Sequence, residues 1–120
     1  MSYEKKGYDR VAKEFGQVVN MSADELRDWL TTDESRSVGW TRKGESESVG
    51  HQSGRRIVDI LGKDPSDLSD ADYDHMNKVV GYCRRHLAQR PGRNVASSRW
   101  RYSLMNWGHD PLKGRGELDD

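Results

Sequence analysis

The chain has 120 residues, of which 33% are charged and 32% are hydrophobic, and its 20 basic and 20 acidic side chains give no net charge. This length predicts one domain with a small core. No apolar run approaches the roughly 18 residues of a membrane span, no signal peptide is recognisable, and one cysteine excludes an internal disulfide, so a cytoplasmic location is expected.

Two short helices are expected in the first third of the chain. Residues 1–7 are polar and are predicted to be a flexible N-terminus. Apolar residues recur at helical spacing over 8–19 and predict the first helix. Ser22 and Glu25 have the spacing of a capping box, which predicts a second helix that ends near Thr31 or Thr32.

The next segment, 33–53, is rich in Ser, Gly, Glu and Arg and has no hydrophobic period. A polar stretch of this length inside a compact domain predicts a long loop with a function or with mobility. Trp40 lies within it and is a candidate partner-binding residue. Ser53 and Gly54 then predict the start of a third helix, which ends near Gly62.

The longest predicted helix spans about 69–90. A serine cap and acidic first turn favour its start, and Pro91 favours its end. Lys78, Tyr82 and Arg85 are expected on the wet side of this helix. The other side carries an apolar stripe with a period near 3.6: Tyr73, Met76, Val79, Val80, Cys83 and Leu87.

A last helix is predicted to begin at Ser97 or Ser98 and to continue through Trp107. Its apolar side chains lie on two sides, which indicates insertion between other elements or contact with a partner. The turn at 109–112 is expected to pin its end to the domain. The acidic residues 114–120 are predicted to form a disordered tail.

Together these elements predict an all-α fold. About five helices form a single small domain over 8–113, organised around the long central helix at 69–90. The third and fourth helices are expected to be antiparallel across the turn at 62–68. The sequence contains no alternating strand pattern and no internal repeat.

Four runs of the sequence resemble a known family: MSADELRDWL (21–30), GHQSGRRIV (50–58), LAQRP (87–91) and WRYSLMNWGHDPL (100–112). They resemble the small proteins catalogued as domain of unknown function 3140, and the resemblance covers about 15–113. Members are often labelled DNA-binding, so the resemblance implies a nucleic-acid partner and assigns no activity. The stretch 22–30 also resembles the helix that opens SAP-type DNA-binding modules.

The neutral net charge conceals a segregation along the chain. Residues 1–75 hold 11 basic and 16 acidic side chains, whereas 76–115 hold nine basic and one acidic. Such asymmetry can mark an anionic partner. The candidate nucleic-acid-binding residues of this half are Lys78, Arg84, Arg85, Arg90, Arg93, Arg99 and Arg101, interleaved with Tyr82, Trp100 and Tyr102.

Guanidinium groups beside aromatic rings suit contact with phosphates and stacking on exposed bases. The alternative is structural. Cations in the last turn of a helix complement its negative end, and carboxylates from the first 75 residues are available to neutralise these arginines.

Arg55 and Arg56 form a second candidate site. They fall in the predicted first turn after Ser53 and Gly54, where backbone N–H groups and guanidinium groups would together bind an anion. The alternative is that Asp59, or an acid of the preceding loop, compensates these two cations.

No metal or cofactor site is predicted. The histidines His51, His75, His86 and His109 are scattered, without the spacing of a zinc site. Cys83 lies on the apolar stripe and is expected to be a buried, inert thiol.

Two functions follow from these patterns. The first is a non-catalytic nucleic-acid-binding protein, located in the cytoplasm or with DNA in a nucleoid or nucleus. The second is a protein–protein adaptor or stress-associated structural protein that docks a partner or a second copy through Trp40 or the last helix. An enzyme is not expected.

Overall fold

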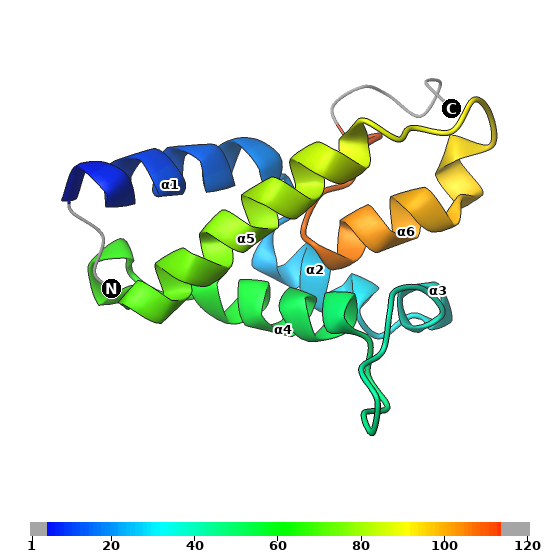
Figure 1. Cartoon of the computed structure of the whole chain (residues 1–120), viewed down its shortest axis with the longest axis horizontal. Helices are drawn as coiled ribbons and strands as arrows, with labels where there is room; N and C mark the ends of the chain where they lie inside the picture. The colour runs from blue at the N-terminus through cyan, green and yellow to red at the C-terminus, as the bar shows by residue number, and fades with distance from the viewer. Residues whose placement is uncertain (1–4, 114–120) are drawn as a thin grey trace.

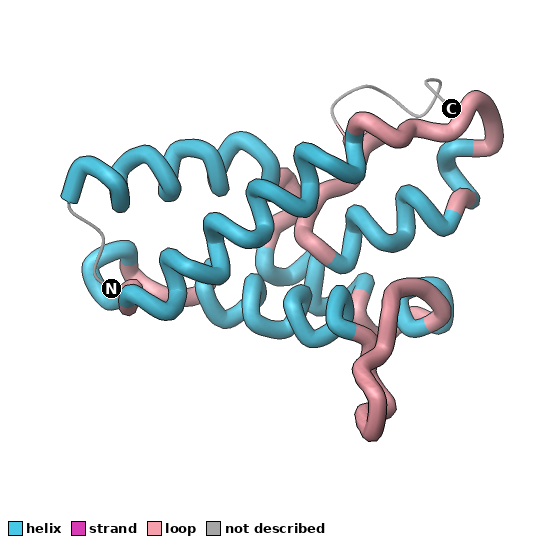
Figure 2. Tube along the Cα trace, viewed as in Figure 1, coloured by secondary structure: helices cyan, strands magenta, loops and turns pink. Residues whose placement is uncertain are grey.

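The computed structural model describes residues 5–113, with side chains from residue 7 onward, and every regular element in that range is helical (Figures 1 and 2). The predicted all-α class is therefore confirmed. The α-helices of this range are α1 (Lys5–Val18), α2 (Ala23–Trp29), α3 (Asp33–Arg36), α4 (Val49–Leu61), α5 (Asp70–Leu87) and α6 (Arg99–Asn106). Short 3-10 turns stand before α5 (η1, Pro65–Asp67) and before α6 (η2, Val95–Ser97).

The long helix α5 is the element against which α1, α4 and α6 pack. Ser69 caps it and forms a capping box with Asp72. Five of the six residues of its predicted stripe are buried, and Leu87 is partly buried. The expectation that Tyr82 faces solvent is wrong, because Trp107 stacks on its ring with 4.2 Å between centroids.

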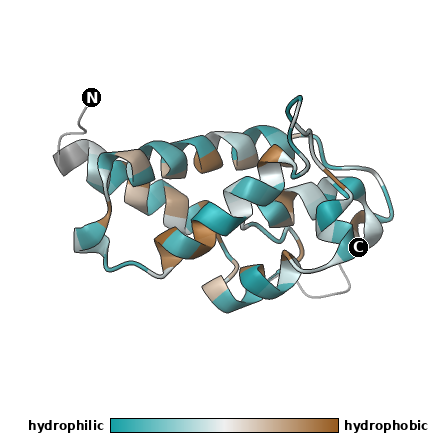
Figure 3. Ribbon diagram, turned by 90° about the horizontal axis from the view of Figure 1, so that it is seen from below, coloured by the Kyte–Doolittle hydropathy of each residue, from teal (hydrophilic) through white to brown (hydrophobic). Residues whose placement is uncertain are grey.

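The first helix, α1, lies along α5 (Figure 1). It begins at Lys5, within the segment 1–7 that was predicted to be flexible. The predictions of a flexible segment at residues 1–4 and of a disordered tail at 114–120 concern residues outside the described range. The rings of Tyr8 and Tyr73 stack with 4.1 Å between centroids. Apolar segments alternate with polar ones along the helices (Figure 3), and each α-helix except the polar α3 contributes buried apolar residues to the shared core.

On the other side of the core, α2 packs against α4. The predicted capping box of Ser22 and Glu25 is present at the start of α2. Contact with α4 is close at Gly54, where an added Cβ would lie 2.7 Å from Leu30 Cδ2 and 2.7 Å from the Asn106 carbonyl oxygen. Only glycine lets these backbones approach so closely.

The segment 33–53 is helical at both ends, which corrects the prediction of one continuous loop. It begins with α3 and already contains the first residues of α4, which Ser48 caps instead of Ser53. The buried side chain of Asn106 holds α3 in place. It accepts hydrogen bonds from Ser35 Oγ at 2.5 Å and from Trp29 Nε1 at 2.8 Å, and donates to the Ser35 carbonyl at 3.0 Å.

The last helix, α6, contacts α2, α3, α4 and α5, so its two-sided apolar character reflects insertion between elements. Of the two predicted N-caps, Ser97 and Ser98, it is Ser98 that caps the helix. After Gly108, with a positive φ of 83°, the chain turns back to the α1–α2 junction. There His109 Nδ1 donates to the Val18 carbonyl at 2.6 Å, and the Asp110 N–H donates to Asn20 Oδ1 at 2.8 Å.

Candidate nucleic-acid interface

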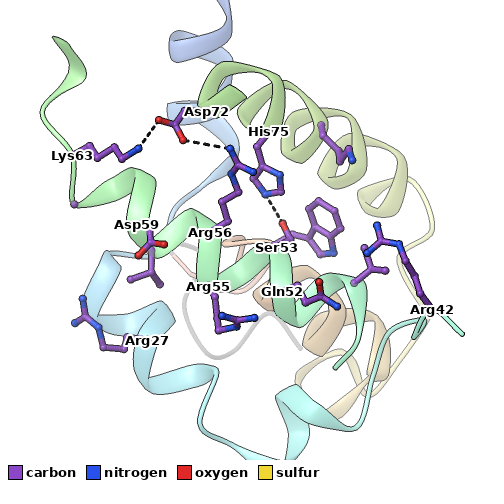
Figure 4. Close-up of a pocket in the computed structure, with 15 residues that line it drawn as sticks. Arg27, Arg42, Gln52, Ser53, Arg55, Arg56, Asp59, Lys63, Asp72 and His75 are labelled. Atoms are coloured by element: carbon purple, nitrogen blue, oxygen red, sulfur yellow. Dashed lines mark hydrogen bonds and ion pairs between the residues drawn. The ribbon is translucent and has the colours of Figure 1, made fainter. Parts of the chain in front are cut away.

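A hollow of about 910 Å³ lies between α4, α5, α2 and the loop before α4 (Figure 4). We call it the α4/α5 hollow. Six cationic side chains line it, together with the carboxylates of Asp59 and Asp72. Three of these cations were predicted as site residues, and three were not. The predicted three are Arg55, Arg56 and Lys78, and the others are Arg27, Arg42 and Lys63.

Arg55 and Arg56 occupy the middle of α4, because the helix begins at Val49. The predicted anion pocket at a helix N-terminus is therefore wrong, and Gly54 is buried beneath α2 and α6. Arg55 Nε and Nη2 donate to the two oxygens of Glu47 at 2.8 and 2.6 Å. Hydrogen bonding to Arg55 is the main reason why the pKa of Glu47 is lowered to about 2.

Asp72 joins two cations on the other side of the hollow. Lys63 Nζ donates to its Oδ2 at 2.7 Å, and Arg56 Nη2 lies 3.6 Å from its Oδ1 (Figure 4). The Asp72 carboxylate is buried, and it also accepts the Ser69 N–H at 3.0 Å. The hydrogen bond from Lys63, followed by the one from Ser69, lowers the pKa of Asp72 to about 2.

Ser53 and His75 contribute neutral polar groups to the hollow. The Ser53 hydroxyl and His75 Nε2 share a hydrogen bond of 2.9 Å (Figure 4). Burial, followed by the charges of Arg56 and Lys78, lowers the pKa of His75 to about 4. The imidazole is therefore neutral near pH 7, and its ring stacks beside Trp107 with 6.2 Å between centroids.

A second hollow lies between α1 and α5, and we call it the α1/α5 hollow. Its charged lining consists of Arg10, Lys78, Arg84, Arg85 and Glu14. Lys78 lines both hollows, so they adjoin along α5. Together they present nine cations and three carboxylates, although the whole chain holds equal numbers of each.

Ion pairs neutralise part of this lining. The α4/α5 hollow holds the pairs described above and two on its rim, Arg27 with Asp24 and Arg42 with Glu45. In the α1/α5 hollow Arg84 Nη1 lies 3.6 Å from Glu14 Oε2. Within the described range, three lining cations have no carboxylate within ion-pair distance: Arg10, Lys78 and Arg85.

The structure separates the nine predicted cations into two groups. Five line the two hollows: Arg55, Arg56, Lys78, Arg84 and Arg85. The other four lie near the C-terminal end of α5, in the following loop and on α6: Arg90, Arg93, Arg99 and Arg101. The nine therefore do not form one continuous lining.

Two of the outlying arginines have roles within the fold. Arg101 donates from Nε and Nη2 to both oxygens of Asp110 at 3.1 and 3.0 Å, and from Nη1 to the Ala96 carbonyl at 2.9 Å. Arg99 donates to the Ser37 carbonyl at 3.0 Å. Both arginines therefore make contacts within the fold, although with other partners than the structural alternative named, because Asp110 lies outside residues 1–75 and Arg99 bonds a carbonyl.

Aromatic side chains near the outlying arginines are also part of the packing. Trp100 donates from Nε1 to the His86 carbonyl at 2.6 Å, and Arg90 lies over its ring, 5.6 Å from the centroid. Tyr102 packs at a tilt against Trp29. Trp40 differs from them, because 68% of its surface is exposed.

Cys83 and His51 are both engaged inside the fold. Cys83 is buried, its thiol lies 3.8 Å from the Trp107 carbonyl, and burial raises its pKa to about 12, as expected of an inert thiol. His51 Nε2 donates to the Leu30 carbonyl at 2.8 Å, while its Nδ1 contacts Glu47. No cluster of three or more metal-ligating side chains occurs among the described residues.

Four cations that line the hollows were not predicted as site residues from the sequence: Arg10, Arg27, Arg42 and Lys63. They come from α1, α2, the loop before α4 and the turn after α4, inside the acidic part of the chain, so no local charge run marks them. Helical spacing does not place Lys63 either, because α4 ends at Leu61, two residues before it.

In a comparison with protein-family models, residues 14–105 match the family described as "Protein of unknown function (DUF3140)". No curated protein and no solved structure matches the chain. None of the helices in the described part of the chain is long and apolar enough to cross a membrane.

Proposed function

The chain belongs to the DUF3140 family of proteins of unknown function, and since that membership assigns no activity, we propose from the geometry that it is a non-catalytic nucleic-acid-binding protein. The α4/α5 and α1/α5 hollows would bind the phosphate backbone. Such a protein acts where nucleic acid is present, in the cytoplasm, a nucleoid or a nucleus.

The observation that carries this proposal is the continuity of the two hollows at Lys78. A nucleic-acid backbone presents a row of anionic groups, so its ligand surface must be extended and predominantly cationic. Nine cations distributed over α1, α2, α4, α5 and the intervening loops satisfy this requirement, and Lys78 connects the two hollows.

The ion pairs within the hollows do not remove this attraction. Both partners are exposed in the two rim pairs, Arg27 with Asp24 and Arg42 with Glu45. Exposed pairs contribute only about 0–1 kcal/mol, so a phosphate can exchange with these carboxylates at low energetic cost. Lys78 and Arg85 require no exchange, because neither has a carboxylate partner in the described structure. Among the lining residues of α5, these two side chains should therefore contribute most to affinity.

Fluorescence anisotropy with a labelled 20-nucleotide strand and its duplex tests the proposal. Affinity should fall steeply between about 50 and 200 mM salt, because each phosphate contact releases counterions. The double variant Lys78→Ala/Arg85→Ala should weaken binding and flatten the log–log salt dependence by about 1.4–1.8, the value for two lost contacts.

The matched control is Arg93→Ala/Arg99→Ala, which removes two exposed cations outside the hollows. It should leave both affinity and salt slope close to wild type. Absence of binding to every strand at low salt would refute the proposal. Equal loss in the two double variants would show attraction by overall charge and would reject the hollows as the site.

A protein–protein adaptor is the second candidate, and the exposure of Trp40 favours it. A single large exposed aromatic side chain is common at protein interfaces. Light scattering during size-exclusion chromatography discriminates, because self-association through this side chain should be lost in Trp40→Ala.

A further inference from the structure

We propose that the protein binds single-stranded nucleic acid with one unpaired base held against Trp40, in a narrow space next to the α4/α5 hollow. We call this space the Trp40 slot. This inference rests on the proposed function and makes it more specific, because it distinguishes a single strand from a duplex and assigns the exposed tryptophan a role.

The Trp40 slot has a volume of about 290 Å³ and a mostly apolar lining. Trp40, Gly50, Tyr82 and Trp107 form its walls, and Ser103 is a polar residue in its lining. Its volume is at the lower end of the range for small-molecule sites, which suits one planar ring.

The position of the slot suggests its ligand. Val49 and Trp107 line both the slot and the α4/α5 hollow, so an aromatic space opens beside a cationic one. A nucleotide has the same two parts, a flat apolar ring and an anionic phosphate, joined through a sugar. Proteins that bind single strands combine such a cationic groove with aromatic side chains on which bases stack.

Trp40 is the ring best placed to accept a base. Trp29, Trp100 and Trp107 have aromatic neighbours inside the fold, whereas none of the ring contacts among the described residues involves Trp40. Its backbone is nevertheless fixed, because its carbonyl accepts the Val49 N–H at 2.8 Å. Little conformational entropy remains for binding to remove, since only the side chain is free to rotate.

Gly39 contributes to this arrangement. Its φ of 96° lies in the left-handed region, and an added Cβ would lie 3.1 Å from Ser48 Cβ. Glycine therefore allows the turn that brings Trp40 to the start of α4. The result is an exposed aromatic ring on a backbone with a defined position.

Duplex and single-stranded ligands should respond differently to this slot. Bases in a duplex are paired and stacked, so none can enter without the energetic cost of extrusion. A single strand offers a base freely. The cationic hollows, by contrast, contact only phosphates and should accept either form.

The test uses the full chain and three labelled ligands of equal length: an oligothymidine strand, an abasic strand with the same phosphates, and a duplex. Trp40→Ala should weaken binding of oligothymidine by about 5- to 150-fold, the effect of losing one base–aromatic stack. Its binding to the abasic strand and to the duplex should be unchanged. Trp40→Phe should retain most of the affinity for oligothymidine.

Leu61→Ala is the matched control, because Leu61 is an exposed apolar side chain at the far end of α4 from the slot. It should bind all three ligands as wild type does. Because Trp40 is exposed, its replacement should leave the circular dichroism spectrum and the urea midpoint unchanged.

The outcomes separate the two proposals. If oligothymidine and the abasic strand bind wild type equally, or if Trp40→Ala binds oligothymidine normally, the slot is not a base site, while phosphate binding stands. If Trp40→Ala instead abolishes self-association and leaves oligothymidine binding intact, the slot is a protein-docking site. If no strand binds, the proposed function fails, and this inference fails with it.

Discussion

Arg84 on α5 and Arg101 on α6 belong to the same basic part of the sequence, and each lies near one carboxylate. Arg84 is 3.6 Å from Glu14, and about half of its side chain is exposed to solvent. Arg101 forms two parallel hydrogen bonds with Asp110, and 23% of its side chain and 17% of that of Asp110 are exposed. Surroundings rather than residue type therefore distinguish the two pairs.

The difference separates a cation available to a ligand from one required by the fold. An exposed pair with one long contact is worth little and exchanges readily. A shielded, bidentate pair fixes both partners and leaves a costly unpaired charge when one partner is removed. Substitutions at these two places should therefore have opposite effects on stability and on nucleic-acid binding.

The largest effect on stability is expected from Arg101→Ala. It removes the partner of Asp110 and the donor to the Ala96 carbonyl, and both sites are shielded from solvent. The free energy of unfolding should fall by about 2 kcal/mol, which is less than for a fully buried pair. Urea unfolding followed by circular dichroism measures it.

Arg93→Ala is the control for this change, because Arg93 is exposed and has no carboxylate partner in the described structure. Its unfolding free energy should remain within about 0.5 kcal/mol of wild type. A similar loss of unfolding free energy in both variants would mean that the Arg101–Asp110 pair stabilises the fold no more than an unpaired, exposed arginine does.

A smaller effect, with a defined pH dependence, is expected from Asp72→Asn. The folded pKa of about 2 lies below the unfolded value of about 3.9, so the carboxylate stabilises the fold above the unfolded pKa. That contribution is lost as pH falls from about 4 toward 2. It should amount to roughly 1 kcal/mol, because Lys63 and Arg56 are nearly half exposed and solvent screens them.

The wild-type minus Asp72→Asn difference in unfolding free energy should therefore be constant above about pH 5 and shrink below pH 4. His75 makes its own contribution between about pH 6.5 and 4, and because the charge of Asp72 is the smallest of the causes that shift the pKa of His75, this contribution differs only slightly between the two chains. The substitution also frees two cations of the α4/α5 hollow, so its affinity for a nucleic-acid strand should rise. An unchanged or weaker affinity would contradict the assignment of this hollow.

Local signals in the sequence predicted much of the fold. Ser22, Ser69 and Ser98 cap helices as expected, because capping depends on residues within one turn. The apolar stripe of α5 was also predictable, since it follows from helical periodicity alone. The start of α4 at Ser48 was missed, because the polar residues that follow this cap conceal the helical period.

The candidate site was less predictable, because it depends on contacts between distant residues. Tyr82 was expected to face water, yet the docking of α6 places Trp107 on its ring. The hollows likewise take Arg10, Arg27 and Arg42 from separate elements. A charge run along the sequence indicates how many cations are present, but only the packing of helices decides which of them share a surface.

The smallest effect on stability is expected from Arg84→Ala, which tests the comparison of Arg84 with Arg101 directly. Because half of the Arg84 side chain is exposed and its contact with Glu14 is 3.6 Å long, the unfolding free energy should change by less than about 0.5 kcal/mol. Affinity for a single strand should nevertheless fall, and the salt slope should decrease by about 0.7. Arg84→Lys keeps the charge and should preserve both the affinity and the salt slope.

Arg101→Ala should show the reverse pattern, with lower stability and unchanged affinity at a temperature where it remains folded. If Arg84→Ala instead destabilised the chain and left binding intact, the distinction between an available and a structural arginine would not hold.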